Sequence, residues 1–194
     1  MAPQTLTIIL TGGTIDFEFD PMIDGMKPAR KSVVQKYLNS LNLQVDCNFK
    51  SVPPLKDSRQ MTENDRIKIL NAIEQSPSNR FLIVHGTYRM VETAQFLQKN
   101  ESHLQGKTIV LMGASTPLRH FYQSDATFNL GFAMATLLHS LSGIYIAMNG
   151  AVFTPDKVLF NPSKVRFEDG WDVPEWLKEH KKRTNGKMSH MVIE

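Results

Sequence analysis

The chain has 194 residues, of which 41% are hydrophobic and 21% charged, values ordinary for a folded globular protein. Its 22 basic and 19 acidic residues give a formal charge of +3 and are interspersed, which argues against a nucleic-acid partner. A single cysteine, Cys47, excludes an internal disulfide and a paired-thiol metal motif. Without a signal-peptide pattern or an apolar run near the ~20 residues that span a bilayer, the sequence predicts a cytoplasmic protein that does not enter a membrane.

The first apolar run, Leu6 to Leu10, leads into Thr11-Gly12-Gly13-Thr14. Such a run without polar alternation is typical of a strand buried on both faces of a parallel sheet. Thr14 follows the glycines at the strand end, where its hydroxyl can enter a crevice and neighbouring amides, such as that of Gly13, can hold an oxyanion. Thr14 is therefore the leading candidate nucleophile, and the alternative is a turn threonine that caps the next segment.

The next segment, from Asp16 to Pro28, is acidic and aromatic without a clear period, which predicts a mobile loop or lid. One apolar face predicts a helix from Ser32 to Leu43. Residues Gln44 to Val52 then alternate loosely, which predicts a strand of the same sheet that ends at Pro53-Pro54.

A polar loop, Asp57-Ser58-Arg59, lies between that strand and a helix that we expect to begin at Thr62 and to run to about Gln75. This is the position of a loop that grips a substrate, although Asp57 or Ser58 could instead only cap the helix. Arg59, like Arg89 further along the chain, can bind a carboxylate in a bidentate way or stay solvated.

A second buried strand, Phe81 to Val84, leads through His85-Gly86-Thr87 into a helix from about Met90 to Lys99. Thr87 follows a glycine at a strand end, as Thr14 does, and two such threonines on one sheet edge suit an acyl-transfer site. His85 ends a buried strand, which favours a hydrogen-bonded core histidine over a base.

A third strand, Thr108 to Met112, is followed by a helix from about Phe128 to Leu141 and a strand from Gly143 to Met148. Ser124-Asp125 is interpreted as an N-cap pair, and Asn149 as a residue that ties loops together. Alternating strands and helices predict an α/β fold, a doubly wound, mostly parallel open sheet with helices on both faces. Residues 1–165 form this domain, and 166–194 a helical tail with an amphipathic helix from Trp171 to Lys182.

Three strands thus end in glycine-containing turns, at residues 11–14, 85–87 and 112–116. Ligands of such sheets bind outside the carboxyl ends of the strands, where glycine lets the backbone approach closely. The sequence therefore predicts one shared site in which Gly13 and Gly86 lie against the ligand.

These motifs resemble, in order and over about residues 5 to 165, the N-terminal domain of the asparaginase/glutaminase family of amidohydrolases. The matching segments are Thr11-Gly12-Gly13-Thr14-Ile15, Asp57-Ser58 with Met61-Thr62, His85-Gly86-Thr87 with Met90, Glu92, Thr93 and Ala94, Gly113-Ala114 with Pro117, Ser124-Asp125, Asn129-Leu130, and Met148-Asn149.

The resemblance implies hydrolysis of a side-chain amide through a threonine acyl-enzyme, without a metal or cofactor. Thr14 would be the nucleophile and Thr87 the second catalytic threonine, while Ser58, alone or with Arg59, would hold the α-carboxylate. The implied partner is a small amide or an acidic amino-acid-like ligand, and the implied assembly is a homo-oligomer.

Two positions depart from the family pattern, and the segment Asp16 to Pro28 lacks the tyrosine that the family has near the nucleophile. Tyr88 stands where the family has an aspartate that binds the substrate ammonium. Phe160 is the best match to a lysine that helps to deprotonate the second threonine, and the alternative is a shift of a few residues that brings Lys157 or Lys164 to that place. A threonine hydroxyl is a poor nucleophile unless a partner takes its proton, and a general base supplies about 10²–10⁴ in rate. Efficient hydrolysis of L-asparagine is therefore not expected.

Three hypotheses remain. In the first, an amidohydrolase has a rebuilt relay, with the Tyr88 phenol or a lid carboxylate as base, and Arg59 and Arg89 favour a more negative substrate without a free ammonium. The lid carboxylates are Asp16, Glu18, Asp20 and Asp24. In the second, the fold is a non-catalytic sensor or regulatory module for a small acidic ligand. The third is a scaffold protein that uses an unoccupied sheet edge.

Overall fold

A six-stranded sheet forms the centre of the protein, whose computed structural model describes residues 5–170. The strand order is β4-β1-β5-β6-β7-β8, with the first five parallel and β8 antiparallel to β7. The strands are β1 (Thr5–Gly12), β4 (Asp46–Lys56), β5 (Arg80–Val84), β6 (Thr108–Met112), β7 (Gly143–Met148) and β8 (Ala151–Phe153). The central strands β1, β5 and β6 are almost wholly buried, as their continuous apolar runs predict.

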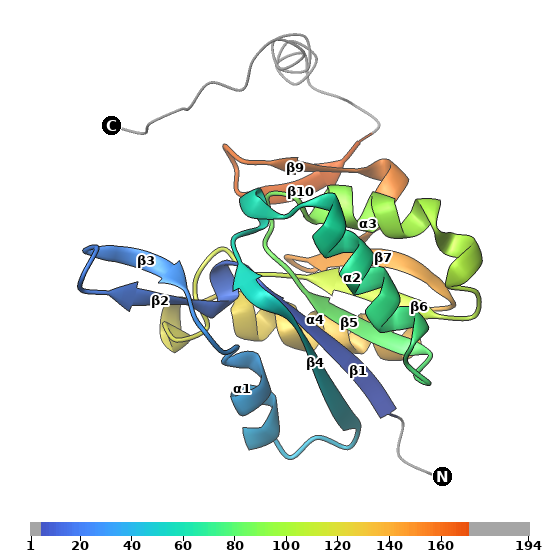
Figure 1. Ribbon diagram of the computed structural model, residues 1–194, viewed down its shortest axis with the longest axis horizontal. Coiled ribbons are helices and arrows are strands. Elements are labelled where there is room, and N and C mark those ends of the chain that lie inside the picture. Colours follow the sequence, from blue (N-terminus) through green and yellow to red (C-terminus); the bar gives the residue numbers. More distant parts are fainter. Residues whose placement is uncertain (1–4, 171–194) are drawn as a thin grey trace, which may run out of the picture.

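Four helices cover the two faces of the sheet (Figure 1). They are α1 (Val34–Ser40), α2 (Glu63–Glu74), α3 (Met90–Lys99) and α4 (Ala126–His139). One core cluster joins α2 and α3 to the sheet through Ile73 and Leu97, and a second joins α1 and α4 through Leu38 and Leu130. The predicted doubly wound, mostly parallel α/β fold is therefore confirmed.

Several expected boundaries agree with the structure. The helix Met90–Lys99 and the strand Gly143–Met148 begin and end where the sequence predicts. At the start of α2, the Thr62 hydroxyl accepts a hydrogen bond from the Asp65 amide, while the Asp65 carboxylate accepts one from the Thr62 amide. This capping box explains why the helix begins at this point.

The expectation of an irregular loop from Asp16 to Pro28 is wrong. Strands β2 (Phe17–Asp20) and β3 (Gly25–Pro28) pair antiparallel and form a hairpin that projects from the body of the protein (Figure 1). The aromatic and acidic residues of β2 alternate with the period of two that a strand requires. Four residues are a short run, so the alternation was overlooked.

The expectation that Pro53-Pro54 ends a strand is also wrong, because β4 continues to Lys56. Strand β4 is the edge of the sheet, where proline costs no hydrogen bond to an outer neighbour. Pairing with β1 is regular up to Leu10 opposite Ser51, and after an irregularity Gly12 lies opposite Lys56. This extension brings the end of β4 to the turn that carries Thr14.

A small antiparallel pair, β9 (Val158–Asn161) and β10 (Arg166–Asp169), follows the main sheet. Strand β10 lies within the segment 166–194 that we expect to form a helical tail, and Arg166–Asp169 is a strand and not part of a helix. The division of the chain at residue 165 stays a prediction. The expected helix from Trp171 to Lys182 lies outside the described residues. No helix within residues 5–170 has the length and apolar character needed to cross a bilayer. Short 3-10 helices occur at Thr14–Asp16, Ser58–Gln60, Glu101–His103, Phe121–Gln123 and Pro155–Lys157.

Candidate functional site

The turns that carry Thr14, Ser58 and Thr87 lie directly against one another through two glycines. A Cβ atom on Gly13 would lie 2.5 Å from the amide nitrogen of Gly86 and 2.6 Å from its Cα. A Cβ on Gly86 would lie 2.6 Å from the Ser58 hydroxyl oxygen. Since only hydrogen fits at these points, the two glycines allow three segments far apart in sequence to meet at the carboxyl edge of the sheet.

The hydroxyls of Thr14 and Thr87 are both unengaged in this arrangement. Thr14 is half-buried, and Thr87 is 5% exposed. Within residues 5–170, neither hydroxyl has a hydrogen-bond partner, and no side chain is in place to remove a proton from either. Gly13 and Gly86, which directly precede the two threonines in the chain, lie against each other.

Asp57, Ser58 and Arg59 form the loop between β4 and α2. The Asp57 carboxylate accepts a hydrogen bond of 2.8 Å from the Arg59 amide, so it caps the short helix Ser58–Gln60 rather than α2. Arg59 also holds this carboxylate in a bidentate way, since Nε donates to Oδ1 at 3.1 Å and Nη2 donates to Oδ2 at 2.6 Å. Burial acts to raise the pKa of Asp57, but the hydrogen bonds from Arg59 outweigh it and hold that pKa below its ordinary value.

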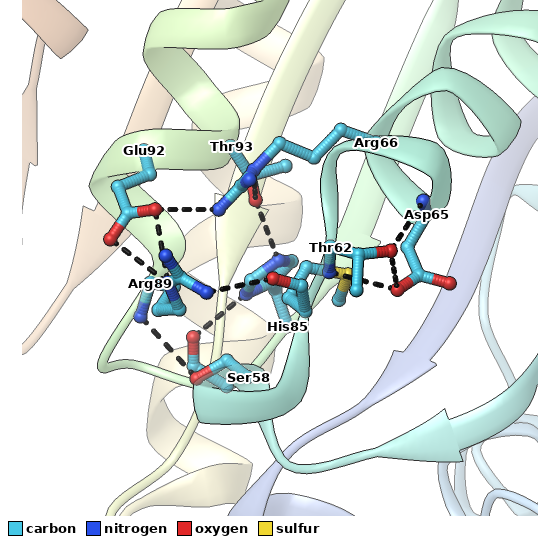
Figure 2. A network of polar contacts seen from close by, with 10 residues as sticks. Ser58, Thr62, Asp65, Arg66, His85, Arg89, Glu92 and Thr93 are labelled. Carbon is cyan, nitrogen blue, oxygen red and sulfur yellow. Dashed lines mark hydrogen bonds and ion pairs between the residues drawn. The ribbon is translucent and has the colours of Figure 1, made fainter. Parts of the chain in front are cut away.

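Arg89 is also engaged by the protein. Its Nε lies 3.0 Å from both carboxylate oxygens of Glu92, and its Nη1 donates to the carbonyl oxygen of Met61 at 2.9 Å. The Arg89 amide donates to the Ser58 hydroxyl at 3.4 Å, which links the two loops (Figure 2). Both guanidinium groups are therefore paired with carboxylates of the protein, while their side chains stay partly exposed to solvent.

His85 is buried behind these turns in a directional network (Figure 2). Its Nδ1 lies 2.7 Å from the carbonyl oxygen of Gly86, and since a carbonyl only accepts, we assign the ring hydrogen to Nδ1. Nε2 then accepts from the Thr93 hydroxyl at 2.9 Å, and that hydroxyl accepts from Nε of Arg66 at 3.2 Å. The prediction of a hydrogen-bonded core histidine is confirmed.

The network has two chemical consequences. Burial lowers the pKa of His85 from 6.5 to about 4, so the ring is neutral at pH 7 and both of its nitrogens are engaged. His85 also fixes the peptide bond between Gly86 and Thr87 with its carbonyl toward the ring. Because the peptide is planar and trans, the Thr87 N–H points the other way, and within the described part of the chain it has no partner.

Asp125 and Asn129 hold the next turn, and their roles were missed from the sequence. Asp125 occupies the N-cap position of α4, and the Ser124 hydroxyl accepts from the Ala126 amide and donates to the Thr116 carbonyl. The Asp125 side chain makes no cap bond and instead accepts from the amides of Ser115 and Thr116 at 3.0 Å.

The buried Asn129 donates to the Gly113 carbonyl and accepts from the Asn149 amide, so Asn149 does tie loops together, through its backbone. In the sequence, the signal for the role of Asn129 is a polar side chain on the apolar face of a helix.

Three of the four lid acids have partners within the protein. Asp16 is wholly buried, and one of its oxygens accepts from the Ser32 hydroxyl and the Val33 amide, which anchors the start of α1. Burial raises its pKa, and its second oxygen has no partner among the described residues. Glu18 pairs with Arg119, and Asp20 pairs with Lys27.

Tyr88 and Phe160, the two departures from the family pattern, contact each other. Their ring centroids are 5.3 Å apart in an edge-to-face arrangement, and Phe160 also packs on the buried Phe167 at 5.1 Å. The guanidinium carbon of Arg59 lies 5.1 Å from the centroid of the Tyr88 ring. Strand β9 thus brings residue 160 beside the turn that carries Thr87.

Comparison with known proteins decides the family. A family model for the N-terminal domain of asparaginases matches residues 5–164. The chain belongs to the asparaginase family. L-asparaginase 2 of Escherichia coli is 29% identical over 159 residues, which cover 78% of this chain and 45% of that protein. The chain therefore spans less than half the length of this curated relative.

Solved asparaginase structures share the fold. L-asparaginase I of Vibrio cholerae superposes with a TM-score of 0.70 at 23% identity, over 87% of this chain and 52% of the other. The thermostable L-asparaginase of Thermococcus kodakarensis gives a TM-score of 0.71 at 20% identity, over 86% and 51%. At these identities the likeness establishes the α/β fold of the asparaginase N-terminal domain.

Proposed function

We propose that the protein is an asparaginase-like amidohydrolase that uses Thr14 as a nucleophile on a small carboxamide. The observation that carries the proposal is the packing of Gly13 on Gly86 and of Gly86 on Ser58. This packing draws two threonine turns and a serine loop together at the sheet edge where ligands of such folds bind.

The proposed reaction has two steps. The Thr14 hydroxyl oxygen attacks the amide carbonyl carbon, the C–N bond breaks, and the amide nitrogen leaves as ammonia with the proton of the hydroxyl. Water then cleaves the resulting ester, which releases the carboxylic acid and restores Thr14. Thr87 is the second catalytic threonine, and its unpartnered amide is a donor available to an oxyanion. Ser58 contributes to binding of the substrate carboxylate.

The proposed relay differs from the family pattern because Tyr88 and Phe160 replace an aspartate and a lysine. No base contacts either threonine hydroxyl in residues 5–170, so slow turnover of L-asparagine is expected.

Ammonia release from a panel of carboxamides tests the proposal. The panel contains L-asparagine, succinamate and N-acetyl-L-asparagine. We expect Thr14→Ala and Thr87→Ala to reduce the release to the background without enzyme. Thr136→Ala is the matched control, because this hydroxyl bonds only the Phe132 carbonyl within α4. Release that persists unchanged in Thr14→Ala would refute the proposed nucleophile.

A second function is a non-catalytic module that senses a small acidic ligand. The engaged His85 and the aromatic pair at Tyr88 and Phe160 favour it, since they leave the threonines without a base. It predicts thermal stabilisation by L-aspartate or succinate with no ammonia release from any amide of the panel. Slow release that depends on Thr14 would argue against it.

From the family resemblance we also infer a homo-oligomer that acts without a metal or cofactor, and from the single cysteine a reducing compartment such as the cytoplasm. Within the described residues, no three His, Cys, Asp or Glu side chains gather as metal ligands would. Sedimentation of the full chain tests the assembly, and activity after dialysis against a chelator tests the independence of metal.

A further inference from the structure

The charged groups around Ser58 and Thr87 leave a surplus of positive charge. Arg59 pairs with Asp57, while Arg66 and Arg89 share Glu92. Three guanidinium groups thus face two carboxylates, and each carboxylate is already held by at least one arginine. An ammonium entering this cluster would have to compete with an arginine for its counter-ion, whereas a carboxylate would meet an unbalanced positive charge.

The exposed ring of Tyr88 lies beside this cluster of charged groups. The ring is 52% exposed and follows Thr87 directly in the chain. Aromatic faces can bind an ammonium, but here the Arg59 guanidinium already lies over the ring, 5.1 Å from its centroid. A second cation at this ring would be repelled by the first.

The other neighbours of the Tyr88 ring are apolar. Phe160 meets it edge to face and rests on the buried Phe167, which holds the half-buried Phe160 ring in place. Tyr88 and Phe160 therefore form a supported aromatic surface beside Thr87. An uncharged apolar group of a ligand would be stabilised on it by burial, with an added contribution if the group is itself a ring.

We propose that the site takes a carboxamide that carries a carboxylate and, in place of a free amino group, an uncharged apolar substituent such as an N-acyl or N-aroyl group. The carboxylate binds at Arg89, which shares Glu92 with Arg66 and so carries the surplus charge, and the substituent packs on Tyr88 and Phe160. The inference rests on the proposed function, because that function places the carboxamide of the ligand beside Thr14. The preference for the N-acylated ligand in binding does not need hydrolysis.

Calorimetric titration of the full chain with N-benzoyl-L-aspartate and with L-aspartate tests the preference, since neither compound has the amide that would be cleaved. We expect the benzoyl compound to bind at least ~10-fold more tightly, because a buried aromatic group contributes about that much or more. Tyr88→Ala should remove most of this difference, and Tyr88→Asp should reverse it. Phe128→Ala, which removes an exposed ring on α4, should leave the difference unchanged.

Equal or tighter binding of L-aspartate to the unaltered protein would overturn the inference, as would failure of both compounds to bind. A benzoyl preference that survives in Tyr88→Ala would do the same. Ammonia release from N-benzoyl-L-asparagine is measured in parallel. Tight benzoyl binding without release contradicts the proposed hydrolysis alone, whereas release from L-asparagine and from its benzoyl derivative with equal kcat/KM contradicts the substrate class alone.

Discussion

The ring of Tyr88 meets the ring of Phe160 edge to face, with centroids 5.3 Å apart and planes inclined at 63°. The family resemblance puts an aspartate and a lysine at these two positions, and here both are replaced by rings that contact each other. Because a charged residue at either position would face an aromatic ring at the other, a change at one position alters the environment of its partner.

The contact between the two rings should appear as a coupling in stability. We expect Tyr88→Ala and Phe160→Ala to be non-additive by about 0.5–1.5 kcal/mol in the free energy of unfolding, the usual range for an aromatic pair. Urea unfolding of both single variants and the double variant measures the coupling. Tyr88→Ala combined with Phe128→Ala should be additive, and additive behaviour of the ring pair itself would contradict the contact.

Restoring the charged pair should favour the free amino acid. Tyr88→Asp together with Phe160→Lys supplies an anion for the ammonium and a cation beside the Thr87 turn. We expect ammonia release from L-asparagine to rise at least ~10-fold, since a well-placed base contributes about 10²–10⁴ in rate. The gain should vanish when Thr14→Ala is added, and a gain that survives that substitution would place the chemistry elsewhere.

The glycine contact between the turns should be highly sensitive to a single methyl group. Gly13→Ala puts a Cβ 2.5 Å from the Gly86 amide nitrogen, at a residue with a φ of +94°. We expect a loss of about 2–4 kcal/mol in the free energy of unfolding, from overpacking and backbone strain together. Gly131→Ala is the control, because among the described residues no atom beyond its chain neighbours and the backbone of its own helix lies within 4 Å of its Cβ, and in helix α4 it should stabilise by about 0.5–1 kcal/mol. Equal effects of the two substitutions would contradict the close approach.

His85 should make stability depend on pH in a defined window. Its pKa is about 4 in the folded protein and 6.5 without the fold, so between these values the unfolded chain binds a proton that the folded chain does not. The contribution of the neutral His85 to the free energy of unfolding should therefore be fully present above pH 6.5. This free energy should fall by about 3 kcal/mol as the pH drops to 4. Urea unfolding at several pH values measures the slope. His85→Gln should flatten it, whereas the exposed His120→Gln should not, and an unchanged slope in His85→Gln would contradict the assignment.

Asp125 should protect the backbone of the turn that it holds. Asp125→Ala removes the acceptor for the Ser115 and Thr116 amides, and we expect a loss of about 1.5–3 kcal/mol. Hydrogen exchange at these two amides should accelerate more than elsewhere. Ser124→Ala removes the bonds of that hydroxyl to the Ala126 amide and the Thr116 carbonyl but leaves the acceptor of the Ser115 amide in place. It should cost about 1 kcal/mol and leave the exchange of the Ser115 amide much slower than Asp125→Ala does.

Much of the sheet could be predicted because its strands are local patterns. The runs that become β1, β5 and β6 are apolar without interruption, and the glycine turns after them follow the sheet edge at which ligands of such folds generally bind. The meeting of the Thr14 and Thr87 turns follows from strand order, since β1 and β5 are neighbours. The Asp16–Pro28 hairpin was missed because four-residue strands carry too few alternations to stand out.

The side-chain contacts around the turns could not be predicted from local sequence patterns. Asp57 and Arg59 were each considered as ligand-binding groups, and the structure pairs them with each other. Thr93 is an apolar-face threonine whose role emerges only when α3 sets it beside His85. The contact of Tyr88 with Phe160 joins the turn before α3 to β9, and the sequence alone could align these positions but not bring their rings together.

Pro53 and Pro54 occur where β4 forms the border of the sheet, next to the end that carries the threonine turns. A visiting polypeptide that tried to lengthen the sheet there would miss a backbone donor, because neither proline has an amide hydrogen and one of two successive strand residues faces outward. Strand addition at this border is therefore favoured along the first half of β4, or at the three-residue β8 on the opposite border.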